Sequence, residues 1–324
     1  MHDRTRTGPG RFIREHTETI TIYIVLVLIA AVGAVIAPGF TSPRNLLNVL
    51  LQAVALGLVA IGQTMVILSG GLDLSVGATI SMVAVYSSGL MGGQPGFTVV
   101  APVLLLTLCM ALAVGFFNSQ LITRLRITPF IATLASGAIV QGVVLVYAKR
   151  PTGLISPGWS WFAEGRIGPV PFAVIFLAIA FAATYLVLSR TILGRYIYAT
   201  GGNENAARLS GIQTGRVLTF VYVFSSFMAA LCSFFLISRM GIGDPQVGGL
   251  NYQRYDLESI AAVLVGGTAL GGGSGGVAGT VAGVLILSLL NNIFNLAGVS
   301  TFYQWTIKGA IILIAVAIYR VQRR

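Results

Sequence analysis

A succession of apolar runs constrains the fold of this chain more than any other feature of its sequence. An α-helix rises 1.5 Å per residue, so a helix of about 20 apolar residues crosses the roughly 30 Å hydrocarbon core of a bilayer. The chain is therefore predicted to be an all-α integral membrane protein with about ten transmembrane helices. The predicted ranges are 20–38, 45–69, 74–92, 98–123, 127–148, 170–189, 216–238, 257–269, 276–296 and 303–319. The eighth range, 257–269, is short enough to be a partial or broken span.

The scarcity of charge excludes a soluble protein. Charged residues make up 9% of the 324 residues and hydrophobic residues 56%, whereas soluble domains carry roughly 25% charged residues to cover a water-facing surface. The first apolar run follows four arginines, as in a signal peptide, but its length of about 18 residues exceeds the roughly 7–15 of a cleavable segment. We therefore predict an uncleaved first span and a single membrane domain at 20–319, between tails at 1–19 and 320–324.

The basic residues predict the orientation in the membrane. The net charge of +11 does not indicate nucleic-acid binding, because the basic residues cluster at the ends of apolar runs rather than in a soluble domain. Cytoplasmic loops of membrane proteins carry an excess of Lys and Arg. If the N-terminus is inside, the inner side receives 13 of the basic residues: Arg4, Arg6, Arg11, Arg14, Arg124, Arg126, Arg190, Arg195, Arg208, Arg216, Arg320, Arg323 and Arg324. The outer side receives Arg44, Lys149, Arg150, Arg166, Arg239 and Arg254. This bias predicts that both termini are cytoplasmic.

The sequence offers no arrangement suited to catalysis or to metal binding. No pair of carboxylates stands at catalytic spacing within a span, and His2 and His16 both belong to the N-terminal tail. Cys109 and Cys232 lie inside apolar runs, where cysteine acts as a small packing residue. We therefore predict that the chain is not an enzyme.

One long polar segment, residues 190–216, interrupts the apolar sequence just past the middle of the chain. Its centre, 203–209, is predicted to be a short helix that is led in by Gly201–Gly202 and ended by Gly211. Glu204 and Arg208 stand four residues apart, a favourable pair on one helix face. This helix either presents itself to another protein or holds two spans in register, and its length and glycine framing exceed what a connector needs.

Asp73 is the acidic residue most closely flanked by apolar sequence. It precedes a predicted helix start, where a carboxylate can cap free backbone N–H groups. Ionisable groups at membrane depth are also often functional, so Asp73 is either a helix cap or part of the substrate path or its gate. The surrounding segment 70–77 has the pattern GG-x-x-L-x-x-G, which returns at 266–273. The match is either a weak internal repeat, as in many transporters, or a coincidence of two glycine-rich turns.

Three further charged positions have two interpretations each. Asp256 and Glu258, with Arg254 close by, either cap the eighth span or contact a soluble binding protein at the outer face. Lys308 lies about six residues into the last span and either reaches the outer interface with its long side chain or takes part in the path.

Short segments spread over most of the chain identify a family. In order, they are 62–68 (GQTMVIL) with 70–77 (GGLDLSVG), 129–134 (PFIATL), 193–199 (LGRYIYA) with 201–204 (GGNE), 207–212 (ARLSGI), 260–263 (IAAV) with 266–268 (GGT), and 290–292 (LNN) with 298–300 (GVS). In this order and spacing, the chain resembles the permease subunits of the ribose-type sugar ABC importers.

The resemblance implies the ABC importer permease fold and a set of partners. Two permease chains, expected to form a homodimer, would make the pore, with a cytoplasmic sugar-import ATPase below and a periplasmic sugar-binding protein above. ATP and Mg would bind to the ATPase, and no cofactor is expected in this chain. The location implied is the bacterial inner (cytoplasmic) membrane, which the chain would cross many times.

The resemblance also suggests residue roles. The segment from Gly194 to Gly211 looks like the coupling helix that sits in a groove of the ATPase, with Gly194, Arg195, Gly201, Gly202, Asn203, Glu204, Ala206, Ala207, Arg208, Leu209 and Gly211 as its residues. The translocation path or gate is assigned to Gln63, Gly70, Gly71, Asp73, Ser75, Gly266 and Gly267. Contact with the binding protein is assigned to Arg254, Asp256 and Glu258.

The predicted function is that of the membrane permease of an ABC importer for a monosaccharide, whether a ribose-like pentose, a hexose or a polyol. One alternative is an ABC permease for a non-sugar such as a branched-chain amino acid. The other is a secondary carrier driven by an ion gradient, for which Asp73 is the candidate buried carboxylate.

Overall fold

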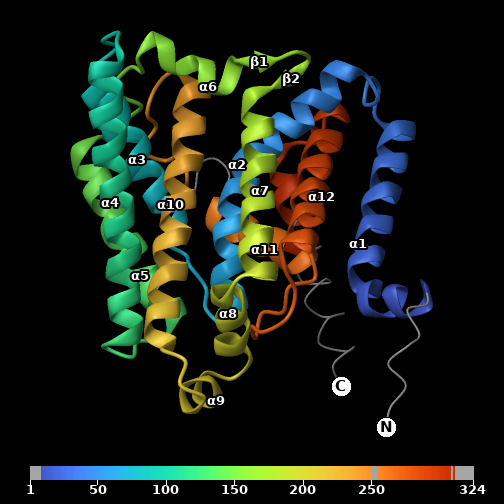
Figure 1. The fold of residues 1–324 in the computed structure, drawn as a ribbon. Helices are drawn as coiled ribbons and strands as arrows, with labels where there is room; N and C mark the ends of the chain where they lie inside the picture. The colour runs from blue at the N-terminus through green and yellow to red at the C-terminus, as the bar shows by residue number, and fades with distance from the viewer. Residues whose placement is uncertain (1–8, 250–253, 308, 311–324) are drawn as a thin grey trace.

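A computed structural model describes residues 9–249, 254–307, 309 and 310, and shows a bundle of long helices with short elements at its two ends (Figure 1). The elements are α1 (Pro9–Ile36), α2 (Pro43–Leu68), α3 (Val76–Met91), α4 (Phe97–Thr123), α5 (Pro129–Tyr147), η1 (Pro157–Ser160), α6 (Trp161–Glu164), β1 (Arg166–Ile167), β2 (Val170–Pro171), α7 (Phe172–Arg190), α8 (Ile192–Gly202), α9 (Glu204–Leu209), α10 (Thr214–Met240), α11 (Tyr255–Val265) and α12 (Val277–Leu296).

Local sequence explains where these helices begin and end. Pro43 opens α2 after Ser42, whose hydroxyl accepts a hydrogen bond from Asn45 N at 3.3 Å. Gly92 ends α3 with a φ of 53°, and Gly241 ends α10 with a φ of 79°. This left-handed backbone carries little cost for glycine, which has no Cβ atom.

Helices α2 and α10 form the centre of the bundle. The most apolar part of α2 is 83% buried and that of α10 is 72% buried, whereas the corresponding parts of α4, α5 and α7 are only 28% buried. The main hydrophobic core joins α2, α3, α10, α11 and α12 through residues such as Leu58, Ile80, Phe235 and Val263. The outer helices keep a broad apolar surface, which suits lipid or a second protein chain.

Nine of the ten predicted spans coincide with helices, with shifted boundaries. Helix α1 begins at Pro9, inside the segment that we predicted to be a tail, and α11 covers only 11 residues. Residues 301–307 are helical at the start of the tenth predicted span, most of which lies outside the described residues. Among the described residues, six helices are long and apolar enough to cross a membrane: α2, α4, α5, α7, α10 and α12. The count of about ten transmembrane helices therefore stays a prediction.

The connecting segments separate to opposite ends of the bundle. Helices α8 and α9 lie at one end, with the turn between α4 and α5, and the hairpin of β1 and β2 lies at the other with α6 (Figure 1). The arginine-rich loops that we predicted to be on the inner side, at 124–126 and 190–216, thus share one end. We call this end the α9 end.

Two spans are interrupted in the middle of the bundle. Residues 70–75 are not helical, so α3 starts only at Val76 and runs for 16 residues, or about 24 Å. Residues 241–249 and 254 are also not helical, and Gly243 pairs with Thr152 at the hairpin end. The two interruptions meet, because Gly77 and Gly248 pack so closely that a Cβ atom on either would overlap the carbonyl oxygen of the other.

Candidate functional site

The polar segment at the α9 end folds into two helices rather than one. Thr191 caps α8 by accepting a hydrogen bond from Gly194 N at 3.2 Å, and Asn203 caps α9 by accepting one from Ala206 N at 3.0 Å. Every third residue of α8, namely Gly194, Ile197 and Thr200, is buried against the bundle. The predicted helix over 203–209 is present, but Gly201 and Gly202 form the last turn of α8 instead of leading into it.

Helix α9 projects from the end of the bundle (Figure 1) and carries the predicted ion pair. Arg208 Nη2 lies 2.6 Å from Glu204 Oε1, and Thr214 Oγ1 donates to the same oxygen at 3.2 Å, which ties α9 to α10. Ala207 is buried beneath the helix, while Leu209 at its end is 91% exposed. Leu209 is therefore free to contact another protein, although a single exposed leucine does not by itself mark an interface.

The cap of α9 provides a direct test of this structure. We expect Asn203→Ala to remove about 1 kcal/mol from α9, because the Ala206 N–H loses its partner. The open form of the segment would then be about fivefold more populated, and limited trypsin digestion after Arg208 would speed up by the same factor. Asn205→Ala, an exposed neighbour outside the cap, serves as the control. Equal digestion rates for the two variants would contradict the capping role.

Three glycine-containing segments meet where α8 rests on the bundle. Gly201 packs so tightly against the end of α2 that a Cβ atom there would overlap the Leu68 carbonyl oxygen. That same oxygen accepts a hydrogen bond from Gly273 N at 3.0 Å. A Cβ atom on Gly272 would lie 2.9 Å from Gly70 Cα. The end of α8, the turn after α2 and the turn before α12 are therefore in backbone contact, and we call this contact the glycine junction.

A side chain of α8 holds the third segment of the glycine junction in place. Tyr198 donates its hydroxyl to the Gly275 carbonyl oxygen at 2.9 Å. Burial raises the pKa of Tyr198 above its usual range, with a smaller contribution from Tyr185, so the hydroxyl keeps its proton near neutral pH. A displacement of α8 would thus be transmitted to both glycine-rich turns.

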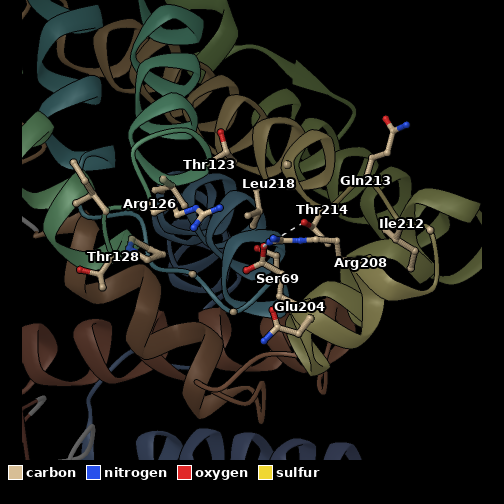
Figure 2. A pocket seen from close by; sticks show the side chains of 18 residues that line it. Ser69, Thr123, Arg126, Thr128, Glu204, Arg208, Ile212, Gln213, Thr214 and Leu218 are labelled. Carbon is tan, nitrogen blue, oxygen red and sulfur yellow. Dashed lines mark hydrogen bonds and ion pairs between the residues drawn. The ribbon is translucent and has the colours of Figure 1, made fainter.

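A hollow of about 880 Å³ opens at the same end, between α9 and the turn that joins α4 to α5. Figure 2 shows Arg126 and Arg208 reaching into it from opposite sides. Gly70 and Gly71 also line it, so the turn after α2 is exposed to the hollow as well as to α8. The predicted coupling residue Arg208 and the predicted path residues Gly70 and Gly71 therefore share one cavity.

Asp73 lies in the interior of the bundle, in the interrupted segment between α2 and α3. Its Oδ1 atom accepts hydrogen bonds from Ser75 N at 2.9 Å and from Ser75 Oγ at 2.6 Å. Its Oδ2 atom accepts from Ser225 Oγ of α10 at 2.8 Å. The carboxylate thus stabilises the turn before α3, whose N-cap residue is Ser75, and links this turn to α10.

Polar side chains from three more helices complete this network. Asn118 of α4 donates to Ser75 Oγ at 2.8 Å and accepts a short hydrogen bond from Ser136 of α5. With its amide oxygen and nitrogen assigned so that both have partners, Gln63 in α2 donates to the Asp73 carbonyl oxygen and accepts from the Asp73 N–H, each at 3.2 Å. Thr133 Oγ1 accepts from Leu74 N at 3.1 Å. Non-helical backbone is tolerated at membrane depth where the protein satisfies its hydrogen bonds, as it does here.

The other predicted path residues also lie in tight packing. Ser75 and Gln63 are fully buried within the network. Gly266 packs against Gly279 of α12, where a Cβ atom would lie 2.5 Å from the carbonyl oxygen. Gly267 has a φ of 80° and faces Ile22 of α1. In this conformation of the single chain, Gly70 and Gly71 are the only two of the seven predicted path residues to line the hollow at the α9 end.

Asp256 lies beside the start of α3, and its contact with a binding protein stays a prediction. The Asp256 Cβ lies 4.0 Å from the position of a Cβ atom on Gly77, near the start of α3. Because α3 extends a further 20 Å or so towards the hairpin end, Asp256 lies well inside the bundle. Arg254 forms an ion pair with it at 3.2 Å, and Glu258 stands two residues further on in the same first turn of α11. Lys308 lies outside the described residues.

Sequence reasoning missed most of the residues that hold Asp73. Asn118, Ser136 and Ser225 each interrupt an apolar run with one polar side chain, which is a visible signal. It does not show which partner each residue meets, because the partners are 18 to 152 residues apart. Within the described part of the chain, no cluster of three His, Cys, Asp or Glu residues could hold a metal ion. Of the two cysteines, Cys232 is buried as predicted and Cys109 is exposed.

The chain is similar to known transport proteins along nearly its whole length. Residues 45–316 match the family described as branched-chain amino acid transport system / permease component. The chain is 41% identical to a ribose import permease protein of Bacillus subtilis over 303 residues, which cover 92% of this chain and 91% of that protein. It is 36% identical to a ribose import permease protein of Escherichia coli K12 over 323 residues, or 98% of each chain. A galactose/methyl galactoside import permease protein of Escherichia coli K12 is 32% identical over 314 residues, or 92% of each chain. No solved structure matches the chain.

Proposed function

The chain belongs to the permease-component family described as branched-chain amino acid transport system / permease component, and we propose that it is the membrane subunit of an ABC importer for a monosaccharide. A permease component moves its solute without converting it, which agrees with the prediction that the chain is not an enzyme. The energy for import would come from ATP hydrolysis on a partner subunit.

One observation carries the choice of a sugar over an amino acid. The family description names branched-chain amino acids, but the three relatives named above, at 32–41% identity over more than 90% of each chain, are import permeases for ribose and for galactose or methyl galactoside. A ribose-like pentose is the first substrate to test, with hexoses and polyols after it. The alternative substrate is a branched-chain amino acid, which the family description names.

The α9 end supports the proposed coupling role. Helix α9 is capped, projects from the bundle and ends in the exposed Leu209. A short, rigid helix of this kind can bind in a groove on the ATPase. The glycine junction then joins α8 to the turns at Gly70 and Gly272. A movement of α9 would be transmitted through α8 to the turns at Gly70 and Gly272 by backbone contacts rather than by flexible side chains.

The remaining features of the assembly follow from the same proposal. We place the α9 end in the cytoplasm, together with both chain termini, and keep about ten membrane crossings in a single domain at 20–319. Two copies of the chain would form the path in the bacterial inner membrane. A periplasmic sugar-binding protein would deliver the substrate at the hairpin end.

Reconstitution tests the proposed function. The chain and its ATPase are incorporated into proteoliposomes together with the sugar-binding protein, and uptake of labelled ribose, galactose and leucine is measured. We expect uptake of a sugar that requires ATP and the binding protein together. Uptake by the chain alone under an ion gradient, or uptake of leucine and no sugar, would overturn the proposal.

Reversal of the ion pair on α9 tests the coupling role. The double variant Glu204→Arg/Arg208→Glu keeps an attractive pair at positions four apart but loses the hydrogen bond from Thr214 to Glu204, so α9 loses about 0.5–1.5 kcal/mol. It presents reversed charges to the ATPase, and we expect substrate-stimulated ATP hydrolysis to fall about tenfold or more, as for repelling charges at an interface.

A second variant separates recognition from folding at the same helix. Leu209→Asp changes a side chain that is 91% exposed, so the fold of the chain alone should not respond. We expect it to weaken copurification of the ATPase with the permease. If both variants retain full stimulation and copurification, α9 is a connector and the coupling role is misassigned.

A further inference from the structure

The hollow at the α9 end lies among polar residues at the end of the bundle. Its walls are the turn between α4 and α5, helix α9, the start of α10 and the turn after α2. Thr123, Thr128 and Thr214 are among its lining residues. Its volume of about 880 Å³ falls within the roughly 300–1,000 Å³ of pockets that bind small ligands. The hollow is therefore large enough to receive a side chain from a partner molecule.

Arg126 gives the hollow a positive charge that the described part of the chain does not neutralise. Among the described residues that line the hollow, Glu204 is the only acid, and it pairs with Arg208 at 2.6 Å. Arg126 is exposed and forms no ion pair with a described residue. Figure 2 shows Arg126 and Arg208 reaching into the hollow from opposite sides. One net positive charge is left over, and Arg208 keeps further N–H groups for a second acceptor.

The backbone at Arg126 supports a role for its side chain. Arg126 has a φ of 56° and is the only residue besides glycine with a positive φ in the described part of the chain. This left-handed conformation is disfavoured for a residue with a Cβ atom, and after the end of a helix it is usually glycine that adopts it. A glycine would relieve the strain, so the turn itself gives no reason for an arginine. Strained residues of this kind are found at functional sites.

Arg126 and its neighbour Arg124 have different surroundings. Residues 124–126 are all exposed, and of the three only Arg126 lines the hollow. Helix α5 begins at the hollow, and the side chain of its N-cap residue, Thr128, makes no capping hydrogen bond. The N-terminus of a helix carries a partial positive charge, which adds to the attraction for an anion. Arg126, Arg208 and the start of α5 together favour a carboxylate or a phosphate.

The location of the hollow indicates a protein rather than a lipid as the source of this anion. Its walls are the ends of helices together with α9, which projects beyond them (Figure 1). The hollow thus lies at the end of the bundle and not on the apolar flank that suits lipid. Because Glu204, Asn205 and Arg208 of α9 belong to its wall, a protein that docks on α9 also covers the hollow. The partner proposed for α9 is the ATPase, so the anion is a carboxylate of that subunit.

We propose that the hollow is a docking site for an acidic side chain of the partner ATPase, whose carboxylate Arg126 and Arg208 bind from opposite sides. This proposal rests on the proposed function, because it needs an ATPase that docks on α9. Arg126 follows α4 and Arg208 belongs to α9, so one carboxylate links two separate elements of the permease. Gly70 and Gly71 also line the hollow, so the docked side chain covers the turn after α2 as well.

The test measures the dissociation constant of the complex between the purified ATPase and the permease in nanodiscs of neutral lipid, at about 0.15 M salt. We expect Arg126→Glu to weaken binding at least tenfold, because it brings two negative charges together at an interface. Arg124→Glu makes the same change of charge in the same turn but outside the hollow, and it should change binding by less than twofold. Equal effects of the two variants would mean that only the overall charge of this end matters, which overturns the docking site.

A second variant keeps the proposal testable if Arg126→Glu does not fold. Arg126→Gly removes the guanidinium and suits the left-handed backbone, so the permease alone should denature at the same temperature as wild type or at a higher one. We expect binding of the ATPase to weaken about threefold or more, with a smaller dependence on salt than in wild type. A folded Arg126→Gly permease that binds the ATPase as tightly as wild type overturns the proposal.

Compensating changes in the ATPase identify the acidic side chain. Each surface Asp or Glu of the ATPase is replaced in turn by Lys, and we expect one of these variants to restore binding to Arg126→Glu permease. If none restores it, no single carboxylate of the ATPase enters the hollow, and the proposal is wrong. If Arg126→Glu weakens binding only in nanodiscs that contain anionic lipid, a lipid headgroup occupies the hollow instead, which also overturns the proposal.

The outcomes separate the docking site from the proposed function. A wild-type permease that binds the ATPase and imports sugar, with unchanged binding in both Arg126 variants, overturns the docking site and leaves the sugar importer intact. A wild-type permease that does not bind the ATPase overturns both. Import of leucine in place of sugar, together with the expected losses in the Arg126 variants, overturns the proposed substrate and supports the docking site.

Discussion

Gly201→Ala is expected to disconnect the α9 end from the rest of the permease. The new Cβ atom would overlap the Leu68 carbonyl oxygen, so α8 must move away from α2, and the Gly273 N–H would lose the geometry of its 3.0 Å bond to that oxygen. Overpacking costs about 1–3 kcal/mol, and 1.4 kcal/mol corresponds to a factor of ten in an equilibrium. We expect ATP-driven sugar uptake to fall about tenfold or more, and stimulation of ATP hydrolysis by the loaded binding protein to fall with it.

The adjacent residue supplies a matched control for this variant. A Cβ atom on Gly202 meets nothing within 4 Å, and Gly202 belongs to the same last turn of α8. Both substitutions replace glycine by alanine, which favours helix by about 1 kcal/mol. A difference between them therefore reports the contact with Leu68 rather than helix propensity. If Gly201→Ala transports as well as Gly202→Ala, the glycine junction does not transmit movement of α8.

The sequence predicted the long spans well because their physical signal is local. Each of α2, α4, α5, α7, α10 and α12 is a continuous run of apolar residues, and such a run forms a helix at membrane depth wherever it packs. The helix over 203–209 was also predictable, since the Asn203 cap and the Glu204–Arg208 pair lie within one turn or two of each other. These features need no knowledge of the rest of the chain.

The interrupted spans were not predictable in the same way. The segment 241–254 is rich in glycine and polar residues, so its sequence predicts an outer loop. Only the contact of Gly248 with Gly77 shows that the described part, 241–249, reaches into the bundle. That contact joins residues 171 positions apart, Gly77 and Gly248. The resemblance indicated that Gly70 and Gly201 both matter, but it did not show that the two lie together in the glycine junction.

The structure also changes the balance between the two interpretations of Asp73. A carboxylate that carries ions or protons needs access to the path, but Asp73 is fully buried and does not line the hollow at the α9 end. Both of its oxygens accept hydrogen bonds from the chain itself, from Ser75 and from Ser225. We therefore infer that Asp73 positions the start of α3, and its part in the substrate path or gate stays a prediction that substitutions can test.

Two substitutions of Asp73 are expected to have very different results. Asp73→Leu leaves Ser75 N, Ser75 Oγ and Ser225 Oγ without an acceptor, at about 1–3 kcal/mol for each buried group. The sum is several kcal/mol, a large part of the stability of a typical protein, so the yield of folded permease should fall more than tenfold. Asp73→Asn keeps one oxygen for Ser75, and the Ser225 hydroxyl can turn to accept from the new amide.

The measurement is sugar uptake per folded permease, with the folded fraction taken from size-exclusion chromatography in detergent. For Asp73→Asn we expect uptake within about threefold of wild type. The variant weakens only one buried hydrogen bond, worth about 0.5–1.5 kcal/mol, and rearrangement of the neighbouring hydrogen bonds recovers most of this energy. A folded Asp73→Asn permease without uptake would mean that the charge itself takes part in transport. That result would favour a carrier with a titratable group in its path. Asp73→Asn separates the two interpretations because it removes the charge and keeps the size of the side chain, which only the positioning role tolerates.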